Sequence, residues 1–160
     1  MRVLFLCTEN SARSIMAEAL LKHHGKGEYE VYSAGTQPHS VDARTLAAIA
    51  HFGLPIDDLR SKHLDEVANI HFDFVITLCD SAATECDKRV NGTHCLAWDF
   101  PEPRARKEAN PFEKTLQELN ERIKMFLLIE QKQQPAAITP TTFYKALADD
   151  IRLKTLLLIA

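Results

Sequence analysis

The sequence predicts an α/β fold with a small, doubly wound parallel sheet of about four strands that is flanked by helices. The apolar run over residues 1–6 shows no alternation, which is typical of a central strand buried on both faces. Helical and strand-like segments then alternate, as expected when helical crossovers join parallel strands. A chain of 160 residues is long enough for one domain with a real core and a short remainder.

The first half of the chain contains the signals for two helices and a second strand. A helix over residues 11–24 follows the first strand, and Gly25 should end it. Residues 28–33 contain a valine between two tyrosines and are expected to form a strand. Ser40 is a good N-cap for the next helix, which should end at Gly53. These segments give one strand–helix–strand–helix run.

The second half predicts two further strands and a long helix. A short helical segment is expected at 64–69, with strands at 72–78 and 94–98. The last helix of the domain has a clear start, with Asn110 as N-cap and Pro111 at its first position. Its apolar residues recur at helical spacing and should dock one face on the sheet: Phe112, Leu116, Leu119, Ile123 and Phe126.

The organisation of the whole chain follows from these signals. We expect a main domain over residues 1–130 and a polar, proline-containing linker over 131–140. Residues 141–160 are expected to form a helical tail that ends with an uncovered apolar face. This tail should pack on the domain or on a second copy of the chain, so a homodimer through the tail is one expected arrangement.

Composition narrows the classes of partner. The net charge is -3 and the basic residues form no long run, so we expect no nucleic-acid partner and no membrane partner. No stretch approaches the roughly 18 apolar residues that a membrane span needs, and the apolar start is too short for a signal peptide. The expected location is the cytoplasm. The four cysteines are then expected to be reduced and catalytic or regulatory, not structural cross-links.

The most informative motif is a cysteine directly after the first strand and an arginine at the start of the next helix. The five residues between Cys7 and Arg13 are enough to wrap a loop whose backbone N–H groups surround a tetrahedral oxyanion. Arg13 adds a planar fork of donors. Nearby cations and a helix N-terminus should lower the pKa of Cys7, which makes it the candidate nucleophile. The expected binding residues are Thr8, Glu9, Asn10, Ser11, Ala12, Arg13 and Ser14.

These residues resemble the loop of the low-molecular-weight tyrosine phosphatase superfamily, which has the pattern C-x5-R-[ST] after the first strand. The chain is most similar to the thioredoxin-coupled arsenate reductases of that superfamily, over residues 1 to about 130. Further matching segments are 33–36, 77–79 and 98–103. The chain departs from the pattern at Glu9, where common members carry glycine, and at Ala12, where they carry cysteine.

The resemblance implies a redox relay of three cysteines. Cys79 and Cys86 have the spacing of the second and third redox cysteines of the reductases. Reduction of arsenate requires two electrons, which thiols supply when they form a disulfide. Were residues 80–86 helical, the two Cα atoms would lie roughly 10 Å apart, whereas a disulfide needs less than about 7 Å. The segment must therefore unwind to oxidise, which would expose the disulfide to thioredoxin, the expected electron donor.

The resemblance also implies a proton donor after the last strand. An aspartate before the final proline of this stretch is the acid in the family, and Glu102 stands in that place. Asp99 is the alternative acid. We expect no bound cofactor and no metal site, because the cysteines and histidines lack ligand spacing. Cys95 is expected to be a small apolar side chain of a strand.

Three functions remain open from the sequence. The first is arsenate reduction by Cys7 with recycling by thioredoxin, and the second is a tyrosine phosphatase that forms a phosphocysteine on the same loop. The third is a non-catalytic oxyanion or arsenite sensor. It is suggested by residues 143–160, which resemble the opening of an ArsR-type winged-helix repressor without its recognition helix.

Overall fold

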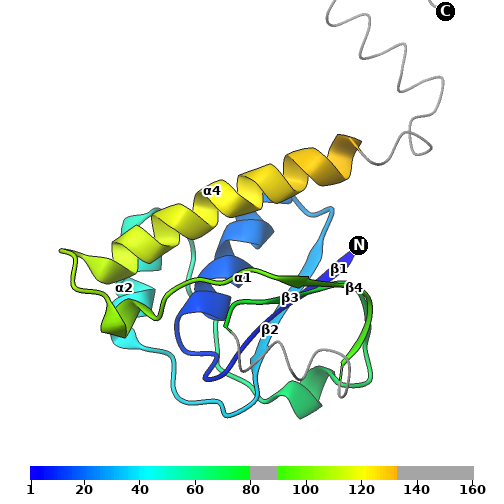
Figure 1. The fold of residues 1–160 in the computed structure, drawn as a ribbon, viewed down its shortest axis with the longest axis horizontal. Helices are drawn as coiled ribbons and strands as arrows, with labels where there is room; N and C mark the ends of the chain where they lie inside the picture. Colours follow the sequence, from blue (N-terminus) through cyan, green and yellow to red (C-terminus); the bar gives the residue numbers. More distant parts are fainter. Residues whose placement is uncertain (80–89, 133–160) are drawn as a thin grey trace, which may run out of the picture. The chain divides into compact units, whose positions relative to one another are not determined.

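The computed structural model describes residues 1–79 and 90–132. They form a four-stranded parallel sheet in the order β2-β1-β3-β4, with helices between the strands (Figure 1). The predicted α/β fold with a doubly wound parallel sheet is confirmed. The strands are β1 (Arg2–Cys7), β2 (Glu30–Gly35), β3 (His71–Thr77) and β4 (Asn91–Ala97). The helices are α1 (Arg13–His24), α2 (Ala43–His51), α4 (Pro111–Lys132), and the 3-10 turns η1 (Leu64–Val67) and η2 (Pro103–Ala105).

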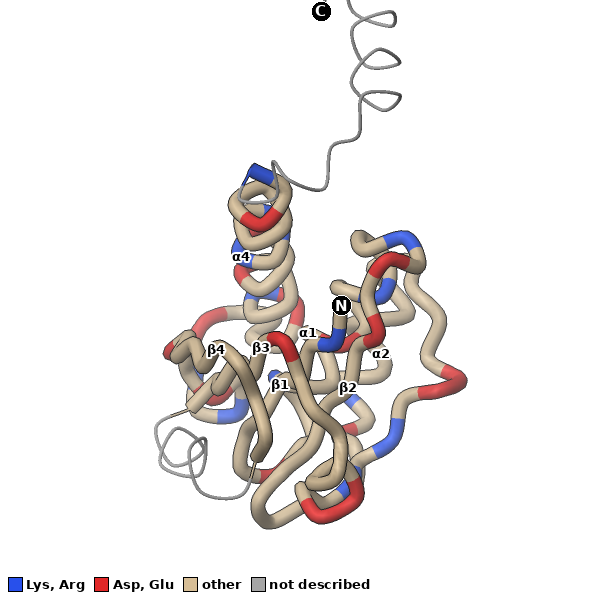
Figure 2. The backbone as a smooth tube through the Cα atoms, turned by 90° about the vertical axis from the view of Figure 1, so that its right-hand side faces the viewer, with Lys and Arg blue, Asp and Glu red and all other residues tan. Residues whose placement is uncertain are grey.

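The strands of the sheet carry few charges, and these lie at its amino-terminal edge (Figure 2). The backbone N–H of Arg2 donates to Asp73 at 2.8 Å, and the Arg2 guanidinium pairs with Glu30 at 3.4 Å. The opposite, carboxyl-terminal edge is where ligands bind in open parallel sheets. The fold therefore keeps its strand charges away from the edge at which the candidate site lies.

The core lies on both faces of the sheet, as the lack of alternation in the first strand predicted. Leu4 and Leu6 belong to a buried cluster that η1 covers with Leu64. Successive side chains of a strand point to opposite faces, so Phe5 lies on the other face, where it contacts Trp98 with ring centroids 6.0 Å apart. A strand enclosed on both faces fixes the position of the residue that ends it.

Some details of the helices differ from the expectation, and α1 begins at Arg13, two residues after its expected start. The cap of α2 is Asp42, whose side chain accepts a hydrogen bond from the N–H of Arg44 at 2.9 Å, so the assignment of the cap to Ser40 is wrong. Both residue types are good caps, and the helix begins two residues later than the sequence indicated. The helix does end before Gly53, which has a φ of 95°. Residues 64–69 form one short 3-10 turn, Leu64–Val67.

Strand β4 lies at the edge of the sheet and is largely exposed. It begins at Asn91, three residues earlier than predicted. Cys95 is exposed and takes part in a disulfide, so the expectation that it is only a small apolar side chain within the strand is wrong. An edge strand has a neighbour on one side alone, which leaves part of its backbone without a strand partner.

Helix α4 begins at Pro111, as its sequence predicted. Its buried apolar residues within the first compact unit of the chain, Met1–Lys124, are Phe112, Leu116, Leu119 and Ile123. A hydrogen bond of 2.6 Å between His24 and Asn120 joins α1 to this part of α4. The helix continues to Lys132 in the second unit, past the expected start of the linker. The rest of the linker and the predicted tail over 141–160 lie outside the described residues.

Candidate active site

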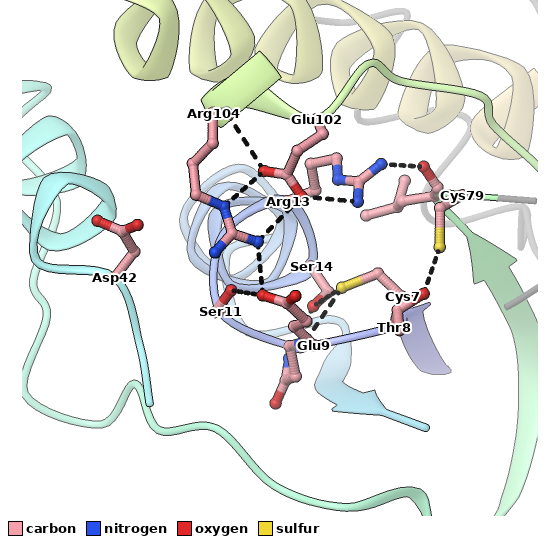
Figure 3. A network of polar contacts seen from close by, with 12 residues as sticks. Cys7, Thr8, Glu9, Ser11, Arg13, Ser14, Asp42, Cys79, Glu102 and Arg104 are labelled. Atoms are coloured by element: carbon pink, nitrogen blue, oxygen red, sulfur yellow. Dashed lines mark hydrogen bonds and ion pairs between the residues drawn. The ribbon is translucent and has the colours of Figure 1, made fainter. Parts of the chain in front are cut away.

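The candidate site lies where β1 and β3 end. These strands are neighbours, with Leu6 opposite Thr77, so Cys7 and Cys79 reach the same edge of the sheet. This is the placement that the parallel topology predicted. We refer to residues 7–14 as the cradle and to residues 98–104, which follow β4, as the acid loop. Figure 3 shows the two loops facing one another.

The backbone of the cradle is fixed by one asparagine. Asn10 has a φ of 50°, a left-handed conformation that asparagine tolerates. Its side-chain oxygen accepts from the N–H of Lys62 at 2.8 Å, and its amide donates to Ser14 Oγ at 2.7 Å. Asn10 and Ser14 are fully buried. The turn of the cradle is therefore held from inside the protein.

Strand β2 approaches the cradle so closely that only glycine fits. A Cβ atom on Gly35 would lie 2.6 Å from the carbonyl oxygen of Thr8 and 3.0 Å from the backbone of Asn10. Such contacts require the backbone to move. Gly35 belongs to a segment on which the family resemblance depends, and this contact gives the physical reason for it.

Cys7 lies inside the cradle with 2% of its surface exposed. Its sulfur shares a hydrogen bond of 3.0 Å with Ser14 Oγ, and the N–H of Asn10 donates to it at 3.3 Å. Burial is the largest influence on the pKa of the Cys7 thiol and raises it, because removal from water disfavours the charged form. Hydrogen bonds from Ser14, the charge of Arg13 and the N–H of Asn10 lower it by less. The expectation of a lowered pKa is therefore wrong.

Arg13 spans the space between the cradle and the acid loop. Its Nη1 donates to the carbonyl oxygens of Phe100 at 2.8 Å and of Leu78 at 3.3 Å. Its Nη2 pairs with the carboxylate of Glu102 at 3.2 Å. One side of the guanidinium is thus anchored on backbone, while the other side holds a carboxylate in the position that an oxyanion would use.

The two acid candidates differ in their position. Glu102 meets Arg13 at the cradle, whereas Asp99 is exposed at the far end of the loop. Trp98 and Phe100 of the same loop are buried, and the Arg122 guanidinium of α4 lies over both rings. The geometry brings Glu102, and not Asp99, to the other site residues.

Arg104 completes the site and was not identified from the sequence. Its guanidinium pairs with Glu9 of the cradle at 2.5 Å and with Glu102 at 3.2 Å (Figure 3). A hydrogen bond from Arg104 is the main reason why the pKa of Glu9 lies below its ordinary value, and Ser11 also donates to Glu9. The available signal was Glu9 itself, because a carboxylate in an anion-binding loop calls for a nearby cation.

A second thiol lies at the rim of the cradle. Cys79 follows β3, and its sulfur shares a hydrogen bond of 3.3 Å with Thr8 Oγ1, the hydroxyl next to the nucleophile. Neither Cys7 nor Cys79 takes part in a disulfide. Cys86, the third cysteine of the predicted relay, lies outside the described residues. Ser11 and Ala12 are buried parts of the cradle.

Within residues 1–79 and 90–132, no group of three or more histidine, cysteine, aspartate or glutamate residues could hold a metal ion. Within the same residues, no helix has the length and apolar character needed to cross a membrane.

These contacts define a class of site. A buried thiol within a loop of N–H donors, with a guanidinium and a carboxylate at its mouth, can bind a tetrahedral oxyanion, attack it and protonate a departing oxygen. The chain belongs to the low molecular weight phosphotyrosine protein phosphatase family, whose model matches residues 2–136.

Individual relatives are similar to the chain over most of its length. An arsenate reductase of Shouchella clausii is 37% identical over 132 residues, which cover 78% of this chain and 93% of the relative. A solved arsenate reductase in the phosphate binding state has a TM-score of 0.70 and 25% identity, over 79% of this chain and 96% of that one. A thioredoxin-dependent arsenate reductase of Corynebacterium glutamicum has a TM-score of 0.66 and 29% identity, over 83% of this chain and 63% of that one. The chain is an enzyme of this family.

Proposed function

We propose that the chain reduces arsenate to arsenite through Cys7 and a disulfide relay that thioredoxin recycles. The observation that carries the proposal is the thiol of Cys79, whose sulfur lies 3.3 Å from the hydroxyl of Thr8 beside the nucleophile. Phosphate ester hydrolysis has no use for a second thiol there, whereas a two-electron reduction needs one. The arsenate reductases among the relatives support the same choice.

In the first step Cys7 attacks arsenate held by the N–H groups of the cradle and by Arg13. The thiol proton of Cys7 passes through solvent to the Glu102 carboxylate before the attack, a sulfur–arsenic bond forms, and one arsenic–oxygen bond breaks. The departing oxygen takes a proton from Glu102 and leaves as water. Glu102 is the proposed acid because it meets Arg13 at 3.2 Å, while Asp99 is the weaker alternative because it is an exposed residue.

The next steps move two electrons onto arsenic. Cys79 thiolate attacks the sulfur of Cys7, the sulfur–arsenic bond breaks, and its electron pair stays on arsenic, which leaves as arsenite. Cys86 thiolate then attacks the sulfur of Cys79 and frees Cys7. Two thiols of thioredoxin reduce the resulting Cys79–Cys86 disulfide. This reductant requires a reducing compartment, so a cytoplasmic location is part of the proposal.

The decisive measurement is arsenate-dependent NADPH oxidation in the presence of thioredoxin and thioredoxin reductase. Cys79→Ser and Cys86→Ser should each abolish multiple turnover and leave hydrolysis of paranitrophenyl phosphate by Cys7 largely intact. Undiminished turnover of the Cys79 and Cys86 variants would overturn the relay.

A tyrosine phosphatase is the second candidate, and the name of the family favours it. Such an enzyme needs aromatic walls beside the cradle to hold a phenol ring. Trp98 and Phe100, the aromatic residues near Glu102, are 6% and 8% exposed and pack beneath Arg122, so they offer no such wall. A higher turnover on a phosphotyrosine peptide than on arsenate would favour the phosphatase. Oxyanion binding without either turnover would indicate a sensor.

The predicted tail over 141–160 lies outside the residues that the family model matches. Its resemblance to a repressor and its role in a homodimer stay predictions. Light scattering of the full chain and of a chain ending at residue 140 tests the homodimer, since loss of the tail should leave a monomer.

A further inference from the structure

One guanidinium, that of Arg104, links the cradle and the acid loop at the mouth of the site. Arg104 Nη2 contacts Glu9 at 2.5 Å and Glu102 at 3.2 Å, and Arg104 Nε contacts Glu102 at 3.3 Å. The Glu9 side chain is 32% exposed and that of Arg104 is 37% exposed, so the pair is open to solvent at one side. Arg104 therefore joins a carboxylate of the cradle to the carboxylate of the acid loop.

Two features of this arrangement conflict with oxyanion binding unless Arg104 resolves them. Glu102 occupies Arg13 Nη2, which an entering oxyanion must take over. Glu9 places a negative charge in the same loop that has to receive an anion, and like charges at this range repel one another. Both carboxylates need a cation other than Arg13.

We propose that Arg104 is a positioning residue with two effects: it retains Glu102 beside the site when an oxyanion displaces it from Arg13, and it neutralises Glu9 so that the cradle accepts the anion. The inference rests on the proposed oxyanion chemistry and adds a residue to it. Binding and proton delivery would depend on different contacts of the same side chain. The contact with Glu9 governs affinity, and the contact with Glu102 governs the rate of the chemical step.

The shape of the guanidinium explains why arginine is needed. Nε and Nη2 address the two oxygens of Glu102, and Nη2 also reaches Glu9. Lysine has the same charge but only a single ammonium group, which cannot match this fork. Arg104→Lys should therefore keep the neutralisation of Glu9 and lose the orientation of Glu102.

The experiment measures anion affinity without turnover, as protection of Cys7 from iodoacetamide by inorganic phosphate. Arg104→Ala should weaken the protection roughly tenfold, as expected when an unbalanced charge is left near a bound anion. Glu9→Gln in the same chain should restore it, because the unpaired charge is gone. Arg60→Ala is the matched control, since Arg60 is an exposed guanidinium that pairs with Glu66 at 2.7 Å on the surface. It should leave the protection unchanged.

Arsenate kinetics supply the second readout. Arg104→Ala should raise KM and lower kcat, and addition of Glu9→Gln should restore KM alone. Arg104→Lys should leave KM near its original value and still lower kcat. A merely structural role of Arg104 would not separate the two constants in this way.

The outcomes separate this inference from the proposed function. Phosphate protection that is unaffected by Arg104→Ala, or a loss that Glu9→Gln does not relieve, would overturn the inference while the oxyanion site stands. If phosphate does not protect Cys7 in the unaltered chain, the oxyanion site and the inference are both wrong. If protection responds as expected but arsenate is not reduced, the inference stands and the reductase assignment fails.

Discussion

The two loops of the site are held by different kinds of contact. The cradle depends on buried hydrogen bonds of Asn10 and Ser14, both fully buried. The part of the acid loop that faces the cradle depends on ion pairs of Glu102 and Arg104, whose side chains are 30% and 37% exposed. Buried bonds keep the cradle in place before an anion arrives, whereas exposed ion pairs can be exchanged for others and are screened by salt. The cradle is therefore preorganised for the anion, whereas the ion pairs of the acid loop can be exchanged when the anion binds.

Loss of the nucleophile should have the largest effect. Cys7→Ser replaces the thiol with a hydroxyl that is far harder to ionise, so arsenate-dependent NADPH oxidation should fall by at least about 10⁴-fold. Circular dichroism checks that the variant is folded. Substantial turnover in this variant would show that the cradle is not the reacting loop.

The acid loop is tested by its two carboxyl groups. Glu102→Gln should lower kcat by roughly 10²- to 10³-fold, the range expected for loss of a general acid. Asp99→Asn is the matched change in an exposed residue of the same loop and should leave kcat within about twofold. The opposite ranking would assign the proton transfer to Asp99.

The rigidity of the cradle is tested at Gly35. Gly35→Ala forces a Cβ against the carbonyl oxygen of Thr8, which would lie 2.6 Å away, so the loop must shift. Displacement by about 1 Å can lower turnover by roughly 10²-fold. Gly53→Ala is the control: it also strains the backbone, at a φ of 95°, but it has no heavy atom within 4 Å of the added Cβ. It should lower thermal stability and spare activity.

The smallest expected effect concerns the ionisation of Cys7. Its pKa is raised by burial, so the thiolate fraction and the alkylation rate should increase as the pH rises toward and through that pKa. Ser14→Ala removes the strongest lowering contact and should move this profile to still higher pH, with alkylation at pH 7 slower by roughly three- to tenfold. Ser11→Ala is the control, because Ser11 donates to Glu9. A shift to lower pH would mean that the Ser14 contact does not stabilise the thiolate.

Much of the fold could be read from the sequence because the signals were local. An unbroken apolar run predicted β1, and Pro111 predicted the start of α4. The cap of α2 was misassigned to Ser40 because Asp42 offers the same chemistry two residues away. The exposure of β4 could not be predicted in this way: β2 is also an edge strand and is mostly buried, so exposure depends on which segments pack over each strand in the whole fold.

In the site, too, contacts within one motif were predicted from the sequence, whereas contacts between distant residues were not. Cys7 and Arg13 stand six residues apart in one motif, so their proximity could be predicted. The contact between Glu9 and Arg104 spans 95 residues and was missed, because spacing within a motif carries no information about such a pair. The raised pKa of Cys7 also escaped prediction, since it depends on how completely the folded protein excludes water from that sulfur.

The neighbouring positions of β1 and β3 affect thermal stability, because they bring Cys7 and Cys79 to the same edge of the sheet. A bond between the sulfurs of Cys7 and Cys79 would close a covalent ring of roughly 70 residues, and rings of that size cost the unfolded chain about 4 kcal/mol of entropy in the usual loop model. A chain trapped with the Cys7–Cys79 disulfide should therefore melt at a higher temperature than the fully reduced chain. The disulfide intermediate of the reaction cycle would thus unfold at a higher temperature than the reduced enzyme that begins the cycle.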